Sequence, residues 1–224
     1  LKKKIEYFYI KLSDTEEFLG RLNDELKTLL AKKKVDSKQV HRLTSEIIEN
    51  VQDLIHKVGP TPEVQEVIKT NVHLAVRAMG SNPRLSKIFA HIFHDPKQYI
   101  SSHSTMLAPI CCALASAQAW SSETTFYKLT MAAYLHDLLL TNQSLAAIST
   151  REELEKRINE FSQNEYQAYM THPTSTAAMV RTFHEIPPDV DIVIAQHHEQ
   201  PDGSGFPRSL QHTHISPLSA VFIL

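Results

Sequence analysis

The stretch that decides the fold is ETTFYKLTMAAYLHDLLL, residues 123–140. Its apolar residues recur at spacings of three and four, which places them on one face of an α-helix. The inner face consists of Phe126, Leu129, Ala133, His136 and Leu140. The stretch therefore predicts a buried helix that carries the imidazole of His136, and the carboxylate directly after it, into the core of a mainly helical domain.

The rest of the C-terminal half follows the same helical pattern. We predict helices over 96–118, over 171–184, and from Pro187-Pro188 to His197. The first has an inner stripe of His103, Leu107, Ile110, Leu114 and Ala117. The second begins at Thr171-His172-Pro173, because proline suits the first turn of a helix. The charged residues 149–160 predict a solvated helix or loop. Histidines of separate helices thus face one core.

The N-terminal part shows helices and a clear break. Residues 5–12 are aromatic and β-branched and permit a strand, although so short a run does not separate strand from helix. Helices are predicted over 14–34, 37–58 and 62–79. Gly80-Ser81-Asn82-Pro83 ends the last one. We therefore divide the chain into residues 1–82, a regulatory or dimerising module that allows a homodimer, and residues 83–224, a metal-binding domain.

Composition narrows the class of protein. The 224 residues carry a net charge of −2, so nothing attracts the chain generally to nucleic acid or to an anionic membrane. The cysteines, Cys111 and Cys112, are neighbours, which fits neither a structural disulfide nor a zinc ribbon. No apolar run of membrane-spanning length and no leader are visible. These features predict a cytoplasmic protein without nucleic-acid or membrane partners.

The 13 histidines are the unusual feature, and ten of them lie from His91 onward. A single histidine on an apolar face is usually a hydrogen-bonded core residue. As a group, however, five imidazoles and a carboxylate buried without partners would cost several kcal/mol. A metal removes that cost by accepting their lone pairs, and imidazole suits iron, manganese, zinc, nickel or copper. The candidate ligands are His103, His136, Asp137, His172, His197 and His198.

Six donors exceed the needs of one tetrahedral zinc ion. A carboxylate between two sets of histidines is a natural bridge, so we expect two metals about 3.5–4 Å apart. Such pairs commonly drive phosphoester hydrolysis, because they bind one phosphate and turn a bridging water into hydroxide near neutral pH. The turn 202–205 offers backbone N–H groups to an anion, with Asp202, Gly203 and Gly205 as candidate substrate-binding residues. Taken alone, this turn fits an ordinary glycine loop equally well.

These residues resemble a known family. His136-Asp137 is similar to the HD doublet of the metal-dependent phosphohydrolases, and His103 to the earlier histidine of their H…HD…D pattern. Thr171-His172-Pro173 and the run HHEQPDGSGFP, residues 197–207, resemble the HD-GYP subgroup, with GFP in place of GYP. Its members are bacterial phosphodiesterases that open cyclic di-GMP. The resemblance spans about residues 96–224, and it implies a helical HD-type bundle with a smaller, mostly helical N-terminal domain.

The resemblance also implies roles. One metal would be held by His103, His136 and Asp137. Asp137, the catalytic residue, would bridge to a second metal held by His172, His197 and His198. Iron is the expected metal, with manganese as second choice. The family's final aspartate ligand would lie on a helix that begins near 215–217, and it is expected beyond Leu224.

Several positions depart from the family pattern. Phe206 replaces the tyrosine, Leu140 a lysine that handles phosphate, Leu139 a glycine and Gln200 an arginine. Loss of such a lysine typically costs orders of magnitude in rate. Members with three metals carry a glutamate where this chain has Tyr99, so two metals are expected and not three.

Three functions stay open at this point. The first is a dinuclear metal-dependent phosphodiesterase that hydrolyses cyclic di-GMP or a related nucleotide by attack of a metal-bridging hydroxide. The second is a catalytically weak or inactive signalling module that binds nucleotide, or a partner protein through the loop 199–208. The third is a mononuclear nucleotidase, which would leave His172, His197 and His198 unexplained.

Overall fold

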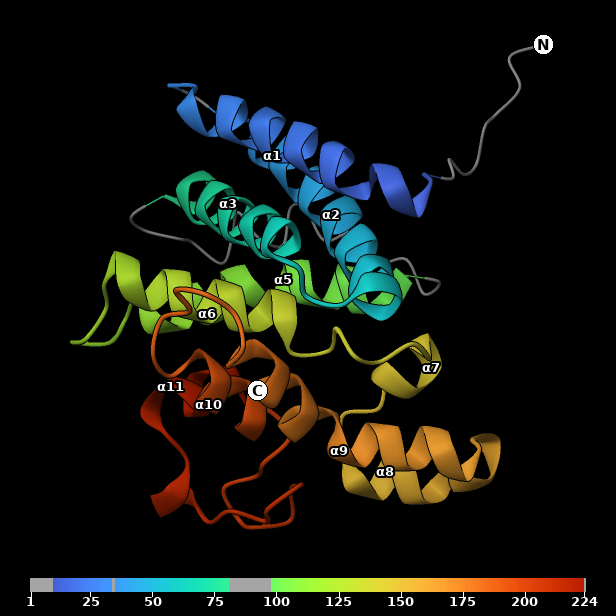
Figure 1. The fold of residues 1–224 in the computed structure, drawn as a ribbon. Helices are drawn as coiled ribbons and strands as arrows, with labels where there is room; N and C mark the ends of the chain where they lie inside the picture. Colours follow the sequence, from blue (N-terminus) through green and yellow to red (C-terminus); the bar gives the residue numbers. More distant parts are fainter. Residues whose placement is uncertain (1–9, 34, 81–97, 224) are drawn as a thin grey trace.

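The computed structural model describes residues 10–33, 35–80 and 98–223, and helices joined by turns make up this part of the chain (Figure 1). The one β pairing within these ranges is an isolated bridge between Asp202 and Gln211. The predicted mainly helical class is confirmed. Most of the permitted strand over 5–12 lies outside the described residues, and Leu12 begins a 3₁₀ helix, η1 (Leu12–Asp14). No described helix has both the length and the apolar character needed to cross a membrane.

The N-terminal part forms three helices with the predicted limits, apart from an earlier end of the first. They are α1 (Thr15–Ala31), α2 (Ser37–Val58) and α3 (Pro62–Met79). Local chemistry sets the boundaries. The Asp36 side chain accepts a hydrogen bond from the Lys38 N–H at the start of α2, and Thr61 caps α3 in the same way, followed by proline in the first turn. Gly59 and Gly80 end α2 and α3 with φ of 81° and 73°.

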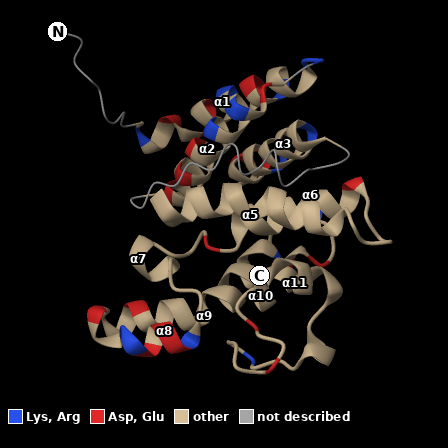
Figure 2. Cartoon of the chain, turned by 180° about the vertical axis from the view of Figure 1, so that it is seen from behind, with Lys and Arg blue, Asp and Glu red and all other residues tan. Residues whose placement is uncertain are grey.

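Two helices form the central layer, α5 (Tyr99–Ala115) and α6 (Glu123–Leu135). Figure 1 shows this pair between the N-terminal helices and the C-terminal helices. Figure 2 shows α5 without any Lys, Arg, Asp or Glu, whereas α1, α2 and α8 carry many. This distribution agrees with burial of the central pair, because charged side chains are costly to bury without partners.

The C-terminal part consists of short elements and one long helix. They are α7 (Gln143–Ala146), α8 (Arg151–Lys156), η4 (Ile158–Glu160), α9 (Gln163–Val180), α10 (Val190–Gln196), η5 (His212–His214) and α11 (Pro217–Phe222). The charged segment 149–160 is therefore a solvated helix and turn, as predicted. The long loop between α10 and α11 lies at the lower edge of the molecule in Figure 1.

One hydrophobic core connects the N-terminal helices to the C-terminal ones. It runs from Leu26 and Val67 through Leu129 to Val193, all essentially inaccessible to solvent. A smaller cluster, which includes Ile100, Leu140, Tyr169 and Phe206, packs beside the histidines. The division at residues 82 and 83 stays a prediction, because residues 81–97 lie outside the described ranges.

Three predicted helices need correction. The helix predicted to begin at Thr171 is wrong, because α9 begins at Gln163 with a capping box between Ser162 and Glu165, which leaves Pro173 inside the helix. The helix predicted over 123–140 ends at Leu135, and residues 136–139 form turns. The helix predicted over 96–118 ends at Ala115.

The inner stripe predicted for the helix over 96–118 is only partly correct. Leu107 is buried, and His103, Ile110 and Leu114 are half-buried, but Ala117 is exposed beyond the helix end. Small residues between these positions are buried as well, among them Ala108 and the two cysteines. The helix is enclosed on most sides, so no single stripe describes its burial.

Candidate metal centre

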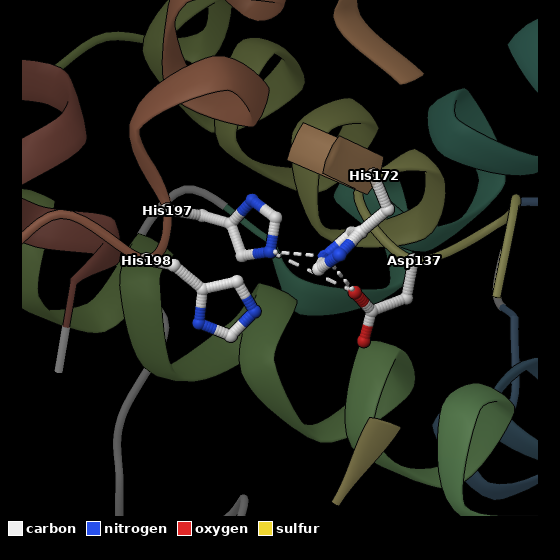
Figure 3. A group of neighbouring side chains, drawn as sticks. All are labelled: Asp137, His172, His197 and His198. Atoms are coloured by element: carbon white, nitrogen blue, oxygen red, sulfur yellow. Dashed lines mark hydrogen bonds and ion pairs between the residues drawn. The ribbon is translucent and has the colours of Figure 1, made fainter. Parts of the chain in front are cut away.

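The six predicted ligands meet in two groups that share one carboxylate. His103, His136 and Asp137 form the first group. Asp137, His172, His197 and His198 form the second. Within each group the ligand atoms lie within 4.8 Å of one another. Figure 3 shows the second group, with the imidazoles turned toward one another and toward the carboxylate of Asp137.

Ends and interiors of four helices bring these side chains together. His103 lies within α5, whereas His136 is the C-cap of α6 and Asp137 follows it in the turn. His172 lies within α9, and His197 is the C-cap of α10 with His198 directly after it. Residues adjacent in sequence therefore enter the site where a helix ends, which lets both side chains of each pair reach the same core.

The imidazoles are oriented by their own backbones. The Nδ1–H of His136 donates to the Ala133 carbonyl (2.9 Å), that of His172 to the Tyr169 carbonyl (2.5 Å) and that of His197 to the Ile194 carbonyl (2.7 Å). In each case the acceptor lies three residues earlier. Because a carbonyl only accepts, Nδ1 carries the hydrogen, and Nε2 of the neutral ring keeps its lone pair. Three lone pairs thus point into the site.

Pro173 explains how a histidine inside a helix finds such a carbonyl. Proline has no N–H, so Pro173 cannot bond the carbonyl of Tyr169 four residues earlier. The Nδ1–H of His172 occupies that carbonyl instead. Pro173 therefore does not start a helix. It frees the acceptor that orients the ligand beside it.

The carboxylate of Asp137 faces both groups. Its Oδ2 lies 3.2 Å from Nε2 of His136 in the first group. Its Oδ1 lies 3.2 Å from Nε2 of His172 and 3.7 Å from that of His197 in the second. Oδ1 is buried and has no hydrogen-bond donor among the described residues. Each carboxylate oxygen is thus placed to serve one group.

This arrangement fits metal ions. Nε2 of His172 lies 3.0 Å from Nε2 of His197, and no hydrogen stands between them when both rings donate from Nδ1. Lone pairs of two imidazoles and one carboxylate oxygen converge on the same space. Such acceptors repel one another unless a cation lies among them. Imidazole nitrogens with one carboxylate suit iron, manganese or zinc.

Burial keeps several of the rings neutral, the form that binds metal. It lowers the pKa of His103 to about 4, helped by His136 nearby. It also lowers the pKa of His197 to about 4, although Asp137 acts against this shift. Burial, with His197 and His172 nearby, brings the pKa of His198 well below its ordinary value. These rings stay unprotonated at neutral pH.

His136 and Asp137 behave as a pair. Burial disfavours charge on His136, but the neighbouring carboxylate outweighs it and raises the pKa of the imidazole. Burial likewise acts against ionised Asp137, yet His136, followed by His172 and His197, brings its pKa well below the ordinary value. Asp137 is therefore a carboxylate at neutral pH.

A buried glutamate organises the loop after the histidine pair, and sequence reasoning gave it no role. The carboxylate of Glu199 is fully buried and accepts the backbone N–H groups of Arg208 (2.8 Å) and Leu210 (2.7 Å). The Phe206 N–H also donates to the His198 carbonyl (3.0 Å). The one available signal was an acidic residue directly after two ligands. Its burial depends on a loop closing around it, which periodicity does not reveal.

The candidate substrate-binding residues have different positions in this loop. Asp202 is exposed, and its Oδ1 accepts from the N–H (2.9 Å) and hydroxyl (2.7 Å) of Ser204. Gly203 adopts a φ of 81°, which favours glycine. Gly205 is buried against the backbone of Glu199 and Gln200. Gly203 and Gly205 are thus required by the shape of the turn, and contact with substrate stays a prediction for all three.

The comparisons with known proteins agree with this geometry. Residues 87–222 match the HD domain family. The chain belongs to this family. The fold of the chain is similar to that of Bd1817, an HDG"Y"P protein from Bdellovibrio bacteriovorus, with a TM-score of 0.64 at 19% identity. The match covers 96% of this chain and 68% of that one. No curated protein matches the sequence.

The departures from the HD-GYP pattern are built into the packing of this HD domain. Leu140 is buried in the smaller apolar cluster. Phe206 belongs to the same cluster, and its ring stacks on His198 at 4.5 Å between centroids and an angle of 17°. Tyr99 stacks on His103 at 5.2 Å and 9°. Leu140, Phe206 and Tyr99 thus each support a ligand or the apolar wall beside it.

The loop conformation should depend on glycine at position 205. In Gly205→Ala the new methyl group would lie 2.3 Å from the Gln200 nitrogen, so the backbone must move. We expect the variant to lose several kcal/mol of stability, an effect of the size seen for severe overpacking. In the control, Gly20→Ala, the methyl group meets nothing within 4 Å on helix α1, and stability should rise by about 0.5–1 kcal/mol. Urea denaturation measures the stability of both variants. Equal changes in stability would contradict the tight packing assigned to Gly205 in the loop.

The metal-free protein should lose stability as the pH falls from 7 to 5. The pKa values of His103 and His197 are about 4 in the folded protein and ordinary in the unfolded chain, so acid protonates the unfolded chain first. The raised pKa of His136 favours the folded protein at lower pH, but this is one group, whereas His103 and His197 both favour the unfolded chain. We expect the melting temperature, measured with chelator present, to fall over this range.

Matched histidine variants test the source of this dependence. His103→Gln should weaken the pH dependence, whereas His212→Gln, which changes an exposed histidine outside the site, should leave it as it is. A melting temperature that rises toward pH 5 would show that the site does not hold neutral imidazoles.

Proposed function

We propose that this protein is a dinuclear metal-dependent phosphodiesterase that hydrolyses cyclic di-GMP or a related nucleotide. The chain carries the HD-domain phosphohydrolase fold and a cluster of His and Asp residues suited to metal binding. The observation that carries the proposal is the placement of Asp137. One carboxylate oxygen faces His136 and the other faces His172 and His197, so one residue can serve two metals.

The two ligand groups would each hold one divalent ion, with iron as the first choice and manganese as the second. When bound, such a pair supplies positive charge for the substrate phosphate and makes the attacking water acidic enough to act near neutral pH. Asp137 is the catalytic residue in this account, because it is common to both groups.

The protein itself contributes preorganisation. Bonds from Nδ1–H to backbone carbonyls hold three imidazoles with their acceptor atoms toward the site. Burial keeps His103, His197 and His198 neutral and ready to bind metal. These groups need no rearrangement before the reaction, which is how an enzyme lowers the cost of reaching the transition state.

The turn 202–205 is the proposed contact for the substrate phosphate. The Ser204 N–H and hydroxyl are bonded to Asp202, which fixes the outer part of the turn. The buried carboxylate of Glu199 holds the segment that follows the turn, because it accepts the backbone N–H groups of Arg208 and Leu210. A loop held at both ends presents its backbone to an anion in one conformation.

One observation favours a second function, a signalling module with weak or no catalysis. The position of the family's phosphate-handling lysine is Leu140, buried within an apolar cluster beside Phe206. Such a module would bind nucleotide, or a partner protein through the loop 199–208. A mononuclear nucleotidase is disfavoured, because His172, His197 and His198 are grouped around Asp137 rather than scattered.

Turnover of cyclic di-GMP tests the proposal. Full-length protein loaded with Fe(II) or Mn(II) under reducing conditions should convert it to the linear dinucleotide, detected by chromatography. Asp137→Asn should lower the rate at least about 100-fold, as expected for loss of a group that stabilises the transition state. The control Asp53→Asn changes an exposed carboxylate on α2 and should keep the full rate. Binding without turnover would favour the signalling module. A protein that neither binds nor hydrolyses the dinucleotide would contradict the phosphodiesterase and leave the module that binds a partner protein.

A further inference from the structure

Helix α2 carries a polar stripe that faces the metal centre. The stripe consists of Ser45, Glu49, Gln52 and His56, at spacings of four, three and four, which places them along one side of the helix. Each of these side chains bonds to a segment that carries ligands of the first metal group. No chemical role for this helix was predicted from the sequence.

One end of the stripe holds the beginning of α5. Ser101 as a whole is 1% exposed. Its hydroxyl donates to Glu49 Oε1 (2.6 Å) and accepts from the Ser45 hydroxyl (3.1 Å). Glu49 Oε2 accepts from the Gln98 side chain at 2.9 Å. Ser101 lies two residues before His103, so these bonds fix the helical turn from which that ligand projects.

The other end of the stripe holds the turn after Asp137. The side-chain amide of Gln52 donates to the Leu140 carbonyl, and Nε2 of His56 donates to the Leu138 carbonyl at 3.1 Å. Both carbonyls lie in or directly after the turn 136–139, where the ladder of α6 supplies no donor, and side chains of α2 satisfy them. The backbone on the C-terminal side of Asp137 is therefore tied to α2.

Among the described residues, His172, His197 and His198 have no such bond to the stripe, and the shared Asp137 is the one ligand of the second group that the stripe reaches. His172 lies on α9, and His197 and His198 lie at the end of α10. The N-terminal helices do reach this region through α3, where Gln65 accepts from the His184 N–H (2.8 Å) and Lys69 pairs with Glu185 (3.3 Å). That turn precedes α10, at the end of the helix opposite to the ligands.

We propose that Glu49 and Gln52 are positioning residues of the metal centre. Glu49 acts through the helical turn that carries His103, so it affects the metal of the first group alone. Gln52 acts on the backbone beside Asp137, which both groups share, so it affects both metals. This assignment rests on the proposed function, because it requires two bound ions.

Metal titration of the full chain tests this assignment. Metal-free proteins are titrated with Mn(II) alone, and free Mn(II) is counted by electron paramagnetic resonance. The wild type should bind two ions. Glu49→Ala should bind one ion with unchanged affinity and the other at least ten-fold more weakly. Ser101→Ala, which removes the hydroxyl bonded to Glu49, should show the same split, so the test stands if either variant fails to fold. Gln52→Met, beside the shared Asp137, should weaken the binding of both ions. Gln39→Met makes the same change at an exposed position of α2 and should match the wild type.

A double-mutant comparison identifies the affected ion. In a His198→Ala background, which weakens the second group, Glu49→Ala should lower the affinity of the remaining ion at least ten-fold. In a His103→Ala background, which weakens the first group, Glu49→Ala should change nothing. If Glu49 had a purely structural role, Glu49→Ala would lower thermal stability and weaken both sites together, and that result would overturn the assignment.

The remaining outcomes separate this assignment from the proposed function. A wild type that binds two ions, with variants that bind both equally well, overturns the positioning role alone. A wild type that binds fewer than two ions overturns the proposed function and this assignment with it.

Discussion

A buried carboxylate surrounded by imidazole lone pairs is the constraint on which the rest of this structure depends. Asp137 is 4% exposed, and its two oxygens face Nε2 atoms of different histidines. The hydrogens of those rings are committed to backbone carbonyls on the far side. Cations relieve the repulsion among these acceptors. The architecture around the site can be understood as a means of holding acceptors together that would otherwise separate.

The backbone provides most of this positioning of the ligands. Two ligand pairs, His136-Asp137 and His197-His198, lie where α6 and α10 end, so neighbouring side chains reach the same space. Within α9, Pro173 frees the carbonyl that orients His172. Helix α2 then bonds the turn after Asp137 through Gln52. Helix ends, a proline and polar side chains from the N-terminal helices thus define one centre.

The sequence was informative where periodicity and caps act locally. The limits of α2 and α3 were predicted correctly, because Asp36, Thr61 and the two glycines are local signals. Periodicity also placed His136 and His197 on buried faces. His172 was grouped with them from its place at a predicted helix start, although its helix begins at Gln163, eight residues before the predicted Thr171.

The start of α9 was missed although its signal is local, because Ser162 and Glu165 form a capping box upstream of Pro173. The other misses have a common physical cause, which is that distant segments take part. The turn after α6 is held by hydrogen bonds from Gln52 and His56, more than 80 residues earlier. Glu199 is understood only once the loop has closed on it through Arg208 and Leu210. No local pattern contains these contacts.

Anomalous X-ray diffraction from crystals of the metal-loaded protein tests the central claim most directly. The account predicts two anomalous peaks, one beside His103 and His136 and one among His172, His197 and His198. A carboxylate oxygen of Asp137 should lie within about 2.0–2.2 Å of each, the usual range for such bonds. A single peak, or two peaks of which only one contacts Asp137, would contradict the shared carboxylate.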